Sequence, residues 1–76
     1  MPRRFSSREV VRALERAGFR QSRQRGSHIQ LTALYGGLNR TVTVVANRRI
    51  VDTKDIASIL RQSGLTRAEF ERPADL

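Results

Sequence analysis

The chain has 76 residues, a net charge of +8, one histidine and no cysteine. A chain of this length makes a single domain, expected to span residues 1–76 with a frayed tail at about 73–76, and its lack of cysteine argues against disulfides and a zinc site. Since no apolar run reaches the roughly 18 residues of a membrane span and the N-terminus turns polar too early for a signal peptide, we expect a cytoplasmic protein with no membrane contact, metal or small-molecule cofactor.

The first expected element is a helix over residues 7–17. The stretch "FSSREV" offers Ser6 as an N-cap and Glu9 three residues later, which together make a capping box. Gly18 stands where a helix end favours a left-handed residue, because glycine adopts a positive φ without steric penalty. The apolar residues between these ends recur at helical spacing and form one stripe: Val10, Val11, Leu14 and Ala17.

The middle of the chain alternates polar and apolar residues, as half-buried strands do. Segments 28–33 and 41–44 alternate most clearly, and the glycines of "YGGLN" between them permit a hairpin turn. The arginine-rich segment 19–25 precedes them as an edge strand. Strand periodicity turns one set of side chains towards the helices, namely Ile29, Leu31, Ala33, Val42 and Val44. It turns the other set towards the open face of the sheet, namely His28, Gln30, Thr32, Thr41 and Thr43.

Two further helices are expected after the strands. Asp52 in "VDTKDI" caps the first, which should span about 53–62 and end at Gly64. The stretch "LTRAEF" makes a second capping box that starts at Thr66, so a brief helix is expected at 67–71. The expected fold is therefore α+β, in the order α-β-β-β-α. It has a three-stranded antiparallel sheet, two helices on one face and a short C-terminal helix.

The positive charge is concentrated in the first two-thirds of the chain. Residues 1–49 carry 11 arginines and 2 acidic residues, which gives +9, whereas residues 50–76 carry 4 basic and 5 acidic residues, which gives −1. Such asymmetry is typical of proteins that bind nucleic acid or another polyanion. The preference for arginine over lysine suits bidentate phosphate contact. Codon bias would explain that preference, but it explains the asymmetry poorly.

The single histidine, His28, lies in this basic region, in the stretch "RQRGSHIQL". No P-loop, Ser/His/Asp set or paired carboxylates accompany it, so proton transfer would depend on its imidazole. RNA suits such a site, because its 2′-OH supplies the nucleophile. Arg23 and Arg25 would stabilise the phosphorane charge, and Gly26 and Ser27 would bring backbone amides close to a phosphate. On these residues alone, an ordinary surface histidine is the commoner interpretation.

Three stretches together resemble the HicA-type toxin family of bacterial toxin–antitoxin systems, namely "VVRALERAGFRQSRQRGSHIQL", "TVTVV" and "IASILRQSGLTRAEF". The resemblance covers residues 8–70, and its most specific part is Gly-Ser-His at the start of a strand. It implies a fold similar to that of double-stranded-RNA-binding domains and a type II toxin that cleaves mRNA without a metal ion. It also implies a HicB-type antitoxin partner and a catalytic role for His28.

The chain departs from the family pattern in two places. Many members carry Pro-x-His after the third strand, where this chain has Val45-Ala46-Asn47. They also often carry Gly-Thr before the second helix, where Lys54-Asp55 stands. The first departure removes a second histidine.

Charge, strand pattern and resemblance together predict a metal-independent endoribonuclease with His28 as its catalytic residue. The residues expected to bind RNA are Arg20, Arg23, Arg25, Gly26, Ser27, Arg48 and Arg49, with Arg3 and Arg4 as further candidates. The alternative function is a non-catalytic RNA-binding module of the same fold. A DNA-binding subunit is a third possibility, but no recognition helix supports it.

Overall fold

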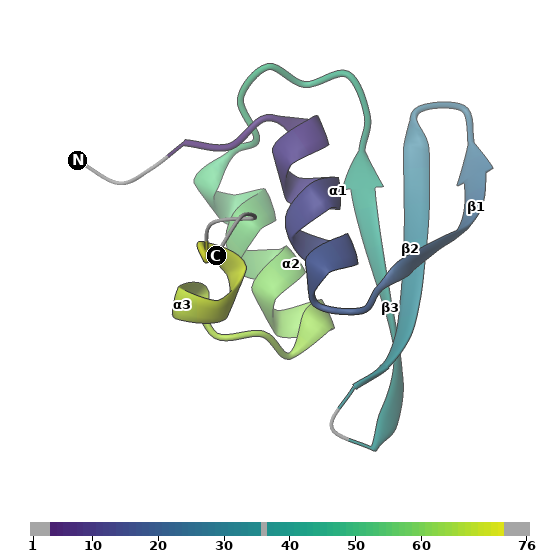
Figure 1. The fold of residues 1–76 in the computed structure, drawn as a ribbon. Coiled ribbons are helices and arrows are strands. Elements are labelled where there is room, and N and C mark those ends of the chain that lie inside the picture. The colour runs from purple at the N-terminus through teal and green to yellow at the C-terminus, as the bar shows by residue number, and fades with distance from the viewer. Residues whose placement is uncertain (1–3, 36, 73–76) are drawn as a thin grey trace.

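The computed structural model describes residues 4–35 and 37–72. Its elements, in chain order, are α1 (Ser7–Arg16), β1 (Arg20–Arg25), β2 (His28–Tyr35), β3 (Leu38–Val45), α2 (Thr53–Ser63) and α3 (Arg67–Phe70). The strands form one antiparallel sheet in the order β1-β2-β3, and α1 and α2 lie on the same side of it (Figure 1). The predicted α+β fold is confirmed. The tail expected to fray, 73–76, lies outside the described residues.

Local sequence signals set the helix ends. The Ser6 hydroxyl accepts a hydrogen bond from the Glu9 backbone N–H (3.2 Å), and the Glu9 carboxylate accepts one from the Ser6 N–H (2.9 Å). Thr66 starts the same reciprocal pair at α3. Asp52 is the N-cap residue of α2, but its side chain makes no capping hydrogen bond, so the predicted side-chain cap is wrong. The third helical position is Asp55, whose shorter side chain replaces the Glu or Gln that normally closes the box.

The hydrophobic core lies between the helices and β2 and β3. Leu31, Val42 and Val44 are buried, whereas Ile29 and Ala33 are half-buried at the margin of the core. These are the five strand residues that the alternation assigned to the helix side, and the prediction is confirmed. The remaining core residues come from the helices and loops: Phe5, Val10, Ala13, Leu14, Phe19, Val51, Ile56, Ile59, Leu65 and Phe70.

The opposite face of the sheet is open to solvent. His28, Thr32, Thr41 and Thr43 are exposed and Gln30 is half-buried, as the alternation predicts. The edge strand β1 is exposed along its whole length, because α1 and α2 pack against β3. The sheet therefore presents one uncovered face and one uncovered edge strand.

Gly64 ends α2 in the left-handed conformation, with φ +77°. We expect Gly64→Ala to lower the free energy of unfolding by about 1–2 kcal/mol, because an L-residue is strained there. A Cβ at this position would also lie 2.8 Å from Cζ of Arg40. That atom is the far end of a flexible side chain, which can move, so backbone strain should dominate.

Urea unfolding of Gly64→Ala and Gly64→Asn separates the two causes. Asparagine carries the same Cβ but tolerates the left-handed region better than alanine does. We therefore expect Gly64→Asn to recover much of the loss. Equal losses in the two variants would instead assign the effect to the contact with Arg40, and a wild-type midpoint for Gly64→Ala would contradict both causes.

Candidate functional site

His28 is the first residue of β2 and lies on the open face, exposed to solvent. Its direct neighbours across the sheet are Arg25 on β1 and Val45 on β3. Side chains directly opposite one another in an antiparallel sheet share a face, with Cβ atoms about 4.5–5.5 Å apart. A group that contacts the imidazole is therefore also within reach of the Arg25 guanidinium.

The next row along the sheet adds more polar groups. Gln30 lies between Arg23 on β1 and Thr43 on β3. A depression of about 280 Å³ is lined by residues of both rows, namely Arg23, Arg25, His28, Gln30 and Thr43. It combines a group that can transfer protons, two fixed positive charges and neutral hydrogen-bonding groups. Such a set can hold a phosphate and act on an adjacent hydroxyl.

A β-bulge brings a third arginine onto the same face. The pairing of β1 with β2 shifts at Ser22, so that Arg20 lies opposite Thr32. The Ser22 hydroxyl donates a hydrogen bond to the Gln30 carbonyl oxygen (3.3 Å). In a regular strand Arg20 and Arg23 would point to opposite faces, because they are three residues apart. The extra residue cancels this offset, and the open face of β1 carries a row of three arginines: Arg20, Arg23 and Arg25.

The turn before His28 is held by hydrogen bonds on both sides. Gly26 has φ +59°, and its carbonyl oxygen accepts a hydrogen bond from the Gln24 side-chain amide (3.2 Å). The Ser27 carbonyl oxygen accepts one from the Ala46 backbone N–H (2.6 Å). The turn is therefore tied to the segment that follows β3, and this fixes where β2 begins and where His28 stands.

The other arginines expected to bind RNA lie elsewhere. Arg48 follows β3, its backbone N–H donates to the Ser7 hydroxyl (3.0 Å), and the residue lines a groove between β3 and α2. Arg49 is exposed in the same loop. Arg4 lines a separate hollow near the start of α2, and Arg3 lies outside the described residues. The structure thus brings Arg23 and Arg25 together with His28 in one depression, whereas Arg20, Arg4, Arg48 and Arg49 are not among the residues that line it.

Gln30 and Thr43 line the depression although the sequence did not single them out as site residues. The alternation put both on the open face. What it does not supply is the cross-strand register, which sets Gln30 beside Arg23 and Thr43 beside Gln30. The sequence therefore predicts on which face of the sheet these two residues lie, but not which residues lie next to them.

No group of three or more histidine, aspartate or glutamate side chains is arranged to hold a metal ion within residues 4–35 and 37–72. In the same ranges, the helices are too short or too polar to cross a membrane.

The sequence matches the family model described as the HicA toxin of bacterial toxin–antitoxin systems over residues 7–65. No curated protein matches the chain. The matched region starts with α1 and ends just after α2, so it contains the whole sheet and the depression around His28. Because the match covers well over half of its length, the chain belongs to the HicA toxin family of bacterial toxin–antitoxin systems.

Proposed function

We propose that the protein is the toxin of a type II toxin–antitoxin system and that it cleaves mRNA without a metal ion, with His28 as the catalytic residue. Membership of the family implies a toxin that has an antitoxin partner, here proposed to be of the HicB type. The observation that carries the finer proposal is the position of His28 beside Arg23 and Arg25 in one depression. Since the proposed substrate is mRNA, the proposed place of action is the cytoplasm.

The proposed reaction uses the nucleophile that RNA carries. The 2′-OH attacks the adjacent phosphorus, the bond to the 5′ oxygen breaks, and a 2′,3′-cyclic phosphate and a 5′-OH are formed. His28 takes the proton of the 2′-OH or gives one to the leaving 5′ oxygen, and water takes part in the other proton transfer. Arg23 and Arg25 stabilise the negative charge that builds up on the phosphoryl oxygens. Gln30 and Thr43 offer hydrogen bonds to the ribose or base.

A non-catalytic RNA-binding module is the second candidate function. RNA cleavage moves two protons, whereas the residues that line the depression include a single histidine and no carboxylate. The row of β1 arginines would bind RNA equally well without any cleavage. This composition of the depression is the specific observation that favours the alternative.

Incubating the purified protein with a defined mRNA in EDTA separates the two functions. A metal-independent ribonuclease is expected to yield fragments that end in a 2′,3′-cyclic phosphate and begin with a 5′-OH. Expression in cells is expected to arrest growth and shorten messages. If the protein binds the RNA at low salt but leaves it intact, the binding module is the correct function.

The β1 arginines are expected to set the salt dependence of RNA binding. Each of Arg23→Ala and Arg25→Ala should weaken binding and reduce the slope of log affinity against log salt concentration by about 0.7 on single-stranded RNA, the value for one lost phosphate contact. Fluorescence anisotropy at several salt concentrations measures this slope, in the His28→Ala background so that the RNA stays intact. Arg61→Ala, an exposed arginine of α2, is the matched control. Equal slopes for all these variants would remove β1 from the RNA-binding surface.

A further inference from the structure

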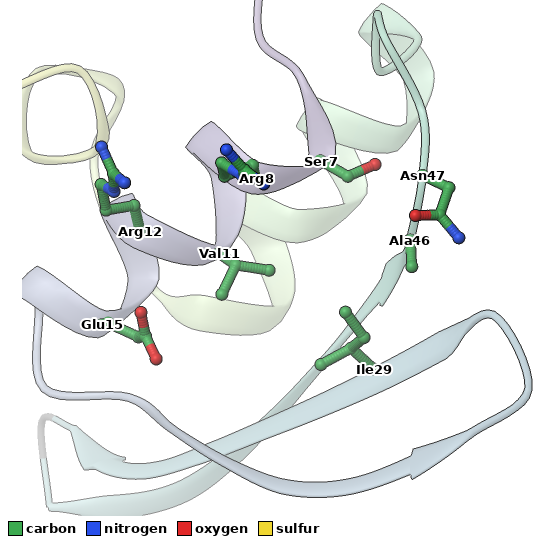
Figure 2. Close-up of a pocket in the computed structure, with 8 residues that line it drawn as sticks. All are labelled: Ser7, Arg8, Val11, Arg12, Glu15, Ile29, Ala46 and Asn47. Carbon is green, nitrogen blue, oxygen red and sulfur yellow. The ribbon is translucent and has the colours of Figure 1, made fainter.

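A second groove lies on the helix side of the sheet, between α1 and β2 (Figure 2). Its volume is about 330 Å³, and its floor contains Val11 of α1 and Ile29 of β2, whose side chains point towards each other. Both residues are half-buried, so the core is incompletely covered here. Ile29 follows His28 directly, and successive strand residues point to opposite faces. The groove and the His28 depression therefore lie on opposite sides of the same strand.

The rim of the groove is charged. Arg8 and Arg12 are one helical turn apart on α1, and both are exposed. Within the described ranges, neither side chain has an ion pair or a hydrogen bond. Glu15 stands at one end of the groove, and Ser7 and Asn47 stand at the other (Figure 2). An aliphatic floor thus meets two available positive charges and a polar margin.

We propose that this groove binds a segment of the antitoxin that carries aliphatic and acidic side chains. An aliphatic side chain would cover Val11 and Ile29, and carboxylates would pair with Arg8 and Arg12. An apolar centre with a polar, charged rim is the usual composition of a protein–protein contact. The inference rests on the proposed function, because it takes the partner to be the antitoxin of a HicA toxin.

The composition of the groove favours a peptide over RNA. Base recognition in single strands uses aromatic or guanidinium stacking platforms beside a phosphate-binding track. No aromatic residue is among those that line the groove, and its floor is the aliphatic pair Val11 and Ile29, which suits an aliphatic side chain better than a nucleic-acid base. The arginine row of β1, on the other face of the sheet, is better suited to binding the phosphates of RNA.

The position of the groove makes toxicity and neutralisation separable. A segment held on the helix side leaves the catalytic imidazole untouched and serves as an anchor for the rest of the antitoxin. Substitutions at Arg8 and Arg12 should therefore lower the affinity for the antitoxin while leaving the cleavage site intact.

The test compares the double variant Arg8→Glu/Arg12→Glu with wild type, both carrying His28→Ala, in binding to the purified cognate antitoxin. We expect the affinity to fall on the order of tenfold to a hundredfold, because both charge pairs are reversed. Arg61→Glu, an exposed charge reversal on α2, is the matched control and should keep wild-type affinity. In cells, Arg8→Glu/Arg12→Glu with His28 restored should remain toxic and escape an antitoxin dose that protects against the wild type.

Methyl NMR spectra locate the contact directly. The signals of Val11 and Ile29 should shift on addition of antitoxin and stay in place on addition of a single-stranded RNA. Shifts caused by RNA instead, or wild-type antitoxin affinity in the folded double variant, would overturn the inference. Circular dichroism checks the fold, and Arg8→Gln/Arg12→Gln carries the same test if the charge-reversed chain fails to fold. If the wild type is not toxic, the proposed function is wrong. The binding measurement still tests whether the antitoxin contacts the groove.

Discussion

Replacing His28 with alanine is expected to slow RNA cleavage by about 10²- to 10⁴-fold, the usual contribution of a positioned general acid or base. The imidazole is exposed, and within the described part of the chain no hydrogen bond engages it. Its removal should therefore change the free energy of unfolding by no more than about 0.5 kcal/mol. RNA binding should persist, because the arginine row of β1 is unchanged. A loss of rate with fold and affinity intact is the signature of a catalytic group.

Single-turnover cleavage of end-labelled RNA in EDTA measures this rate, and anisotropy measures the affinity in parallel. Thr32→Ala is the matched control, since Thr32 is also exposed on the open face of β2 but lies opposite Arg20, outside the residues that line the depression. It should cleave at the wild-type rate. If His28→Ala also cleaves at the wild-type rate, the imidazole takes no part in the reaction.

The face on which His28 lies could be predicted because it depends on a local rule. Alternation in β2 puts every second side chain on the same face, and the apolar partners Ile29 and Leu31 identify the face that packs on the helices. Helix starts are equally local, because a capping box joins residues three positions apart, as Ser6 and Glu9 are. Asp52 is the N-cap of α2 as the sequence predicts, but its side chain makes no capping hydrogen bond, so the residue type gave the start of the helix and not the contact.

The arginine row of β1 could not be predicted in the same way. A strand records its register in the sequence only when one of its faces is buried. All six residues of Arg20–Arg25 are polar and exposed, so nothing in the strand marks which side is which. The bulge at Ser22 exists only in the pairing with β2, and it alone turns Arg20 to the side of Arg23. The alignment of the three arginines on one face therefore depends on how β1 pairs with β2 and not on the sequence of β1 alone.

The groove beside α1 could not be predicted from the sequence, for a related reason. Val11 belongs to the apolar stripe of its helix, and Ile29 belongs to the helix-facing set of its strand. A periodic pattern says that such residues face inward, but it does not say how much of them a neighbour covers. Both remain half-buried, because the helices pack towards β3 and leave the β1 side of the sheet open. The proposed antitoxin groove therefore contains two residues, Val11 and Ile29, that their periodic patterns assign to the core.

Phe70→Ala is expected to lower the free energy of unfolding by about 3–5 kcal/mol, as for other large aromatic residues removed from a core. The Phe70 side chain is fully buried, at 0% exposure. Its ring meets that of Phe5 edge to face, with centroids 4.9 Å apart, a geometry worth roughly 0.5–1.5 kcal/mol beyond burial. Domains of this size have stabilities of about 4–11 kcal/mol, so the variant should be only marginally folded.

Both rings of this pair lie outside residues 7–65, the part of the chain that matches the family model. Phe5 is also fixed by its backbone, since its carbonyl oxygen accepts a hydrogen bond from the Val51 N–H (2.7 Å). The segments on either side of residues 7–65 therefore pack together and complete the core. We expect urea unfolding, followed by circular dichroism, to give Phe70→Ala a much lower midpoint than wild type. Leu34→Ala, at a position 72% exposed, should differ little from wild type. Equal midpoints for the two variants would mean that the matched region is stable by itself and that α3 only rests against it.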